Sequence, residues 1–225
     1  MNYSDIRPAR FLDRPNRFIA HAELDGQRVT AHVKNTGRCR ELLIPGAAVF
    51  LQHVPSPGRK TEYDLIAVEK GEKLLNMDSA APNAVFGEWL QAGGLGPAEA
   101  IRPECVHGDS RFDFSFTLHG RLCFAEVKGC TLEEDGIARF PDAPTERGIK
   151  HLRGLAKAVR EGCDAYAVFV IQMRGVRYFE PNRKTHPAFA DALREARDAG
   201  VRLRAFDCEV SPDSLQIAEP VELRL

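Results

Sequence analysis

The sequence predicts a mixed α/β chain, α+β overall, with a small β-barrel at residues 1–80 and an α/β sandwich with a mixed sheet at residues 81–225. Three observations predict this fold. The first part holds five short strand-like segments separated by polar turns, which is typical of a small barrel. A Ser-Ala-Ala-Pro break follows at residues 79–82. Beyond it, helical and strand-like segments alternate, as they do in α/β sandwiches.

The barrel prediction begins with a hairpin. Residues 17–24 and 27–34 flank Asp25-Gly26, a dipeptide typical of a type I′ turn between antiparallel strands. Further strands are expected at residues 47–54, 63–69 and 73–77. Five short strands within about 80 residues suit a small barrel, and an OB-like barrel is one such solution.

The second part is expected to begin with a helix at residues 83–91, which Gly93-Gly94 ends. The run at 164–172 is almost continuously apolar and is typical of a central strand covered on both faces. The elements that follow the first helix are a hairpin, a helix, a strand, a helix and a strand, expected at residues 111–128, 145–161, 164–172, 187–199 and 201–206.

The hairpin at residues 111–128 is the most informative stretch of the chain. Four apolar residues, Phe112, Phe114, Phe116 and Leu118, alternate with polar ones, which is the period of a half-buried strand. If the turn consists only of His119-Gly120, the register places Asp113 directly opposite Glu126. Lys128 lies two residues beyond Glu126, on the same face of the same strand.

This arrangement predicts a metal site. Side chains opposite each other on neighbouring strands have Cβ atoms roughly 4.5–5.5 Å apart, so two carboxylates there repel unless a proton or cation lies between them. Mg²⁺ or Mn²⁺ is the expected cofactor, because Mg²⁺ typically takes one or two protein carboxylates and keeps its waters. A lysine beside such an ion can bind a scissile phosphate. The alternative is ordinary charge on the polar face of an antiparallel strand.

Charge is distributed unevenly along the chain, although the net charge is only −1. Residues 1–60 carry ten Lys/Arg and five Asp/Glu, whereas residues 61–142 carry seven and fifteen. A basic first part beside an acidic middle suits a polyanion-binding module next to a cation-binding one, although a solvated surface would show the same excesses. Candidate phosphate contacts are Arg14, Arg17, Arg28, Lys34, Arg38, Arg40, Arg59 and Lys60, with Phe11, Phe18 and Phe50 as possible base-stacking rings.

A second basic group is expected at the start of the helix at 145–161. Arg147, Lys150 and His151 lie in its first two turns, where free backbone N–H groups and the helix dipole favour phosphate. Thr145 is the expected N-cap residue. The alternative is a solvated basic face.

Several classes of protein are not expected from this sequence. No apolar stretch is long enough to span a membrane and no signal-peptide core is visible, so we expect a soluble, cytoplasmic protein. The six cysteines form no Cys-x-x-Cys pair, so structural zinc is not expected. A pI near 6.7 argues against a purely electrostatic coat for nucleic acid. The oligomeric state stays open.

Several segments together resemble the sugar fermentation stimulation protein A family. They include Gly108-Asp-Ser-Arg-Phe-Asp113-Phe, Glu126-Val-Lys128, Phe140-Pro-Asp-Ala and Thr145-Glu-Arg-Gly-Ile-Lys-His151-Leu. The acid and lysine pattern is also similar to the PD-(D/E)-x-K nuclease superfamily, although its Pro-Asp pair reads Phe112-Asp113 here. The resemblance implies an OB-like first domain and a restriction-endonuclease-like αβββαβ second domain.

The resemblance also implies roles for particular residues. Asp113 and Glu126 match the metal ligands, Lys128 the catalytic lysine, and Glu88 the carboxylate of the first helix, a possible third ligand. DNA is the implied partner, with single and double strands both open. The first functional hypothesis is a Mg²⁺- or Mn²⁺-dependent nuclease. The alternative is a non-catalytic DNA-binding transcriptional regulator of sugar (maltose) metabolism on a nuclease scaffold.

Overall fold

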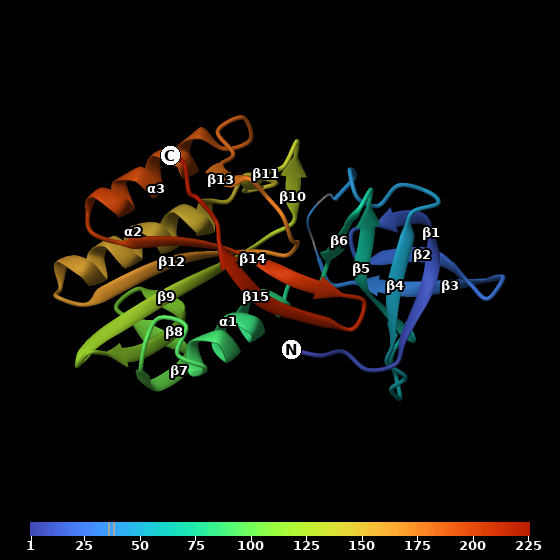
Figure 1. Cartoon of the computed structure of the whole chain (residues 1–225), viewed down its shortest axis with the longest axis horizontal. Helices are drawn as coiled ribbons and strands as arrows, with labels where there is room; N and C mark the ends of the chain where they lie inside the picture. The colour runs from blue at the N-terminus through green and yellow to red at the C-terminus, as the bar shows by residue number, and fades with distance from the viewer. Residues whose placement is uncertain (36, 38) are drawn as a thin grey trace.

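The structure is a computed structural model that describes residues 1–35, 37 and 39–225. A β-barrel and a larger α/β domain lie side by side (Figure 1). The strands of the barrel are β1 (Ile6–Asn16), β2 (Ile19–Leu24), β3 (Gln27–Val33), β4 (Ala48–His53), β5 (Tyr63–Lys70) and β6 (Lys73–Asn76).

Five of these strands form a closed ring. The sheet runs β3-β2-β1-β4-β5-β6, and a parallel pairing of β3 with β5 closes it, from Ala31↔Tyr63 to Val33↔Leu65. Closure joins the two edges of the ring, and β6 pairs with the later part of β5, from Ala67↔Asn76 to Lys70↔Lys73. The predicted OB-like barrel is therefore confirmed.

The hydrophobic and turn pattern of the sequence predicted some strands of the barrel and missed another. Asp25 and Gly26 have φ of 52° and 76°, as a type I′ turn requires, and they join β2 to β3 as predicted. The sequence did not predict β1, because Pro8, Pro15 and several arginines interrupt its alternation.

The second part adds three helices and a six-stranded sheet. Its helices are α1 (Ala81–Gln91), α2 (Glu146–Arg160) and α3 (Pro187–Asp198). The sheet runs β15-β14-β12-β9-β8-β7. These strands are β7 (Ala98–His107), β8 (Ser110–Leu118), β9 (Arg121–Cys130), β12 (Asp164–Ile171), β14 (Arg202–Ser211) and β15 (Ser214–Pro220).

The central strand β12 is parallel to both β9 and β14, whereas the outer pairs are antiparallel, so the predicted mixed sheet is confirmed. Helix α1 covers one face of the sheet, and α2 and α3 cover the other (Figure 1). Two hydrophobic clusters result, one on each face. Every residue of β12 except the first is buried, as its apolar run predicted.

A small second sheet was not predicted. It consists of β10 (Leu132–Glu134), β11 (Ile137–Phe140) and β13 (Tyr178–Pro181), in the order β10-β11-β13. Strand β7 also went unpredicted, because it lies at the edge of the large sheet and is mostly exposed, so it lacks buried apolar positions.

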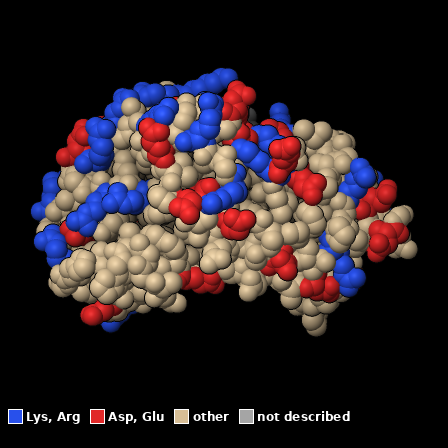
Figure 2. All heavy atoms as spheres, in the orientation of Figure 1, with Lys and Arg blue, Asp and Glu red and all other residues tan. Residues whose placement is uncertain are grey.

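Charged side chains are spread unevenly over the surface. On the face drawn in Figure 2, Lys and Arg gather over α2 and α3, whereas the surface over α1, β7 and β8 carries few charges. Within the described residues, no helix combines the length and the apolar character needed to cross a membrane.

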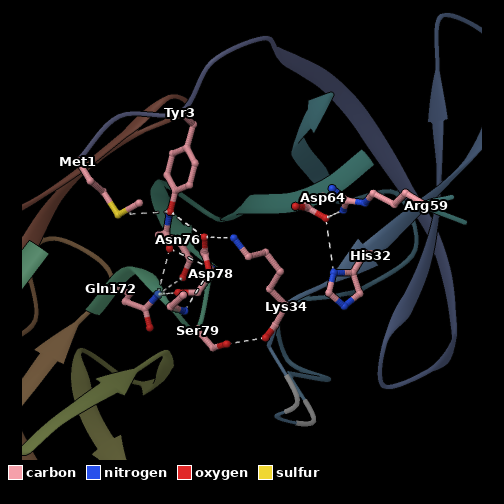
Figure 3. Close-up of polar contacts among 11 residues, drawn as sticks. Met1, Tyr3, His32, Lys34, Arg59, Asp64, Asn76, Asp78, Ser79 and Gln172 are labelled. Carbon is pink, nitrogen blue, oxygen red and sulfur yellow. Dashed lines mark hydrogen bonds and ion pairs between the residues drawn. The ribbon is translucent and has the colours of Figure 1, made fainter. Parts of the chain in front are cut away.

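Polar contacts hold the barrel against the second domain (Figure 3). Lys34, which follows β3, pairs with the buried carboxylate of Asp78. Gln172, at the end of β12, donates from Nε2 to Asn76 Oδ1 at 3.0 Å and to the Asp78 carbonyl oxygen at 2.9 Å. Tyr3 accepts a hydrogen bond from Asn76 Nδ2 at 3.1 Å. The end of β6 and the end of β12 are thus joined through buried polar groups.

A second set of polar contacts, formed by ion pairs, links β5 and β6 to β10. The Lys70 ammonium lies 2.8 Å from Glu133 Oε2, and the Lys73 ammonium lies 3.3 Å from Glu133 Oε1. Burial alone would raise the pKa of Glu133, but hydrogen bonds from Lys70 and Gly136 and the two positive charges outweigh burial and lower the pKa.

Glu133→Gln is therefore expected to destabilise the protein by about 1–3 kcal/mol at pH 7. A carboxyl whose pKa is lowered on folding stabilises the native state above its unfolded pKa of about 4.3, and this contribution disappears as the pH falls through the folded pKa. The free energies of unfolding of the wild type and the variant should therefore converge below about pH 4. Urea unfolding across this pH range checks it, and a constant difference would contradict it.

Candidate active site

The hairpin of β8 and β9 carries the acid pair that the sequence predicted. Strand pairing continues without a break as far as Phe114↔Ala125, in the register expected of a two-residue turn. Asp113 and Glu126 occupy the next position of each strand. The predicted register is therefore confirmed for the part of the hairpin that leads up to these two carboxylates.

Asp113 marks the point at which the two strands separate. Its Oδ2 accepts a hydrogen bond of 2.7 Å from the backbone N–H of Val127, and its Oδ1 accepts one of 3.0 Å from Asn83 Nδ2 of α1. Phe112 packs in the cluster beneath α2, whereas Phe114 packs in the cluster beneath α1. The simple alternation predicted for this strand therefore breaks at Asp113.

Glu126 lies at the centre of the site and is only 2% exposed. Its Oε1 accepts hydrogen bonds from Lys128 Nζ and from His151 Nδ1. Its Oε2 is buried and has no hydrogen-bond partner among the described residues. Burial alone would raise the pKa of Glu126, but His151 and Lys128 outweigh burial and lower the pKa, so the carboxylate stays charged.

His151 of α2 donates a hydrogen bond to Glu126 of β9. Thr145 caps α2 as predicted, since its Oγ1 accepts from the Gly148 N–H at 3.0 Å. Within the same helix, Arg147 Nε lies 3.3 Å from Nε2 of His151, one turn later. A guanidinium only donates, so Nε2 accepts from Arg147, and His151 Nδ1–H faces Glu126. His151 is buried, so its contact is with Glu126 rather than with solvent.

Asp113 and Glu126 are the side chains of this site that could hold a cation. Burial raises the pKa of Asp113, and the charge of Glu126 raises it further. Leaving the buried Glu126 Oε2 without a partner costs free energy, which a hard cation would recover. The described residues contain no group of three or more His, Cys, Asp or Glu side chains able to hold a metal. Two carboxylates nevertheless suffice for Mg²⁺, which keeps several waters.

Glu88 does not join this pair. Its carboxylate is 58% exposed and lies 2.7 Å from the amino group of Met1. On α1, the side chain that reaches the pair is Asn83, because it lies on the side of the helix that faces β8. No site role is predicted for Asn83 from the sequence, where it begins the helix expected at residues 83–91. The three-carboxylate arrangement with Glu88 is thus not what the structure shows.

The predicted phosphate contacts of the barrel fall into two groups. Three are held by carboxylates: Lys34 by Asp78, Arg59 by Asp64, and Arg28 by Asp13 at 2.9 Å. Of these carboxylates, Asp78 and Asp64 are buried, so Lys34 and Arg59 stabilise the fold (Figure 3). Arg38 lies outside the described residues. Besides Arg28, the exposed candidates are Arg17, Arg40 and Lys60 on the barrel and Arg147 and Lys150 on α2.

The barrel reaches the second domain close to this site. The Asp142 side chain lies close to Gly37, since a Cβ atom built on Gly37 would clash with Asp142 Oδ2. A polar cavity of about 110 Å³ lies at the same junction, and its lining includes Asn35, Asp142 and Gly129, the residue after Lys128. Asn35 and Gly37 therefore lie at the junction with the second domain, near the end of β9, the strand that carries Glu126 and Lys128.

The fold and the site define a two-domain protein in which an OB-type barrel precedes an α/β domain of restriction-endonuclease type. Residues 12–77 match the family model described as the SfsA N-terminal OB domain, and residues 80–214 match the one described as the sugar fermentation stimulation protein RE domain. The chain belongs to the sugar fermentation stimulation protein family.

Relatives and a solved structure agree with this assignment. A sugar fermentation stimulation protein homolog of Desulfitobacterium hafniense is 55% identical over 225 residues, covering 100% of this chain and 99% of the relative. A homolog of Clostridium beijerinckii is 50% identical over 226 residues and covers both chains fully. The structure of Pyrococcus furiosus SfsA in complex with Ca²⁺ is 30% identical, with a TM-score of 0.87, covering 100% of this chain and 98% of that one.

Proposed function

We propose that this protein binds DNA and cleaves its phosphodiester bonds in a reaction that depends on Mg²⁺ or Mn²⁺. One observation carries the proposal: the buried Glu126 carboxylate has one oxygen held by Lys128 and His151 and the other without a partner, beside the carboxyl of Asp113. This is a preformed site for a hard cation with an ammonium group alongside it.

Each residue has a distinct task in this proposal. Asp113 and Glu126 would hold the metal, which supplies Lewis-acid polarisation of a phosphoryl oxygen when bound. Lys128 stabilises the negative charge that grows on the phosphate. His151, itself oriented by Arg147, fixes the Glu126 carboxylate in place. The exposed Arg147 and Lys150, at the start of α2, bind a neighbouring phosphate.

The Pyrococcus furiosus relative supports the metal part of the proposal. That protein was solved in complex with Ca²⁺. Ca²⁺ and Mg²⁺ are both hard ions that prefer oxygen ligands, so a fold that binds one of them offers the type of ligands that suits the other. The carboxylates of Asp113 and Glu126 are ligands of this type.

Purified protein should therefore cleave labelled DNA in Mg²⁺ or Mn²⁺, and EDTA should stop the reaction. Asp113→Asn and Glu126→Gln should abolish cleavage without loss of DNA affinity, because each variant removes negative charge from a site that binds a polyanion. Glu88→Gln is the matched control and should cleave like the wild type, since Glu88 pairs with the Met1 amine.

A second candidate function is a DNA-binding regulator that performs no cleavage, which the family name, tied to sugar fermentation, favours. Protein that binds DNA but shows no metal-dependent cleavage would support this candidate and overturn the first. Cleavage that persists unchanged in Asp113→Asn would also overturn the assignment of this site.

A further inference from the structure

We propose that a concave surface on the barrel beside Phe18 binds an unpaired base of a single-stranded nucleic acid. We call it the Phe18 pocket and define it as Phe18 together with the neighbouring cavity, whose lining includes Phe11, Asp13, Arg17, Gly37, Arg40 and Leu43. The inference rests on the proposed binding of nucleic acid and adds the form of the strand that the barrel binds.

The cavity has the size and chemistry of a ligand site. Its volume is about 440 Å³, within the range of roughly 300–1,000 Å³ typical of small-molecule pockets. Phe11, Leu43 and Pro45 supply apolar lining. Arg17 and Arg40 are exposed at the same cavity and supply positive charge. Apolar lining with arginines suits a flat aromatic base attached to phosphates.

Phe18 offers an aromatic face to solvent. It is 49% exposed, and the Arg17 guanidinium carbon lies 5.3 Å from the centre of its ring. Asn16 holds this turn, because its Oδ1 accepts from the backbone N–H groups of Phe18 at 2.9 Å and Ile19 at 3.1 Å. Among the described residues, Phe18 and Ile44 are two of only four large hydrophobic side chains classed as exposed, and both are sequence neighbours of residues that line the cavity.

The charge of the cavity favours nucleic acid over an apolar protein segment as its ligand. The acidic residue among those lining the cavity is Asp13, and Arg28 neutralises it at 2.9 Å while His21 hydrogen-bonds to it at 2.7 Å. Arg17 and Arg40 therefore give the cavity a net positive character, which attracts a polyanion. A duplex hides its base faces by stacking, so only an unpaired base can stack on Phe18.

The lining of the pocket also includes a residue at the junction between the two domains. Arg14 donates to the backbone carbonyl oxygens of Asn35 at 2.8 Å and Gly37 at 2.9 Å. Gly37 lines the cavity and lies close to the Asp142 side chain of the second domain. A strand held in the Phe18 pocket is thus placed on a part of the barrel that reaches the junction with the second domain.

Phe18→Trp turns the pocket into a reporter. With EDTA present to prevent cleavage, a 12-nucleotide oligo(dT) should quench the fluorescence of the new tryptophan, whereas a blunt duplex of the same length should not. Leu122→Trp, at a residue 47% exposed on β9, is the matched control and should be insensitive to both. Phe18→Ala should weaken oligo(dT) binding by roughly 5- to 150-fold, the loss expected for one stacked base.

Two outcomes overturn the inference: an unchanged Phe18→Trp signal with oligo(dT), or wild-type affinity of Phe18→Ala for oligo(dT). Equal quenching by the duplex also overturns it, because the strand would then not need to be unpaired. The proposed nuclease activity fails separately. If Asp113→Asn and the wild type both leave DNA uncut while Phe18→Ala loses oligo(dT) affinity, the pocket stands and the catalytic proposal falls. If cleavage occurs but Phe18→Ala binds normally, only the pocket falls.

Discussion

Lys128→Ala is expected to lower the rate of metal-dependent DNA cleavage by about 10²–10³-fold, the usual cost of removing a group that stabilises charge in the transition state. The Lys128 ammonium hydrogen-bonds to Glu126 Oε1 and its side chain is only 22% exposed, so it is held beside the acid pair. Single-turnover cleavage with saturating DNA and Mn²⁺ measures the effect on the chemical step rather than on binding.

The controls for Lys128→Ala separate charge from structure. Lys150→Ala removes an exposed lysine from α2 and should mainly weaken binding, which more DNA can overcome. Thermal unfolding should show that Lys128→Ala remains folded, because His151 still donates to Glu126. Cleavage by Lys128→Ala at the wild-type rate would remove Lys128 from the proposed mechanism.

The sequence predicted the centre of this site because local chemistry determined it. His119 and Gly120 both adopt positive φ, 50° and 74°, as a two-residue hairpin turn requires, and that turn sets the register of the strands. The register in turn places Asp113 and Glu126 at neighbouring positions. A short turn with clear alternation on both sides thus carries enough information to bring two carboxylates together.

Contacts between distant parts of the chain could not be predicted in this way. The amine that pairs with Glu88 belongs to Met1, 87 residues earlier, and Asn83 reaches Asp113 across 30 residues. Helical periodicity gives the direction of a side chain relative to its own helix but not the element that it will meet. The break in the apolar alternation at Asp113 could not be predicted either, because it arises where β8 separates from β9.

The two groups of lysines and arginines on the barrel also depend on contacts between distant parts of the chain. A lysine or arginine that contacts phosphate cannot be told in the sequence from one that neutralises a buried acid, since residues of both kinds follow a strand and have polar neighbours. Lys34 pairs with a carboxylate 44 residues away, whereas Arg17 stays exposed beside an aromatic ring. Burial of the partner, which only the fold determines, separates the structural role from the binding role.

Lys34→Met is expected to destabilise the protein by about 3–5 kcal/mol, because it leaves the Asp78 carboxylate buried without its cationic partner. The Asp78 side chain is only 2% exposed. Burial and the charge of Asp78 raise the pKa of Tyr3, so its phenol stays protonated, but it is 3.4 Å from Asp78 and cannot replace an ammonium group. Urea unfolding measures the loss.

A double-mutant cycle tests whether the pair itself is responsible. Asp78→Asn removes the buried charge, so in the Lys34→Met background it should recover part of the lost stability, and the coupling between the two positions should exceed about 1 kcal/mol. At a temperature where both proteins are folded, Lys34→Met should keep its affinity for DNA, whereas Arg17→Ala should weaken it in a salt-dependent manner. Unchanged stability together with weaker DNA binding would instead make Lys34 a phosphate contact and the domain junction independent of its charge.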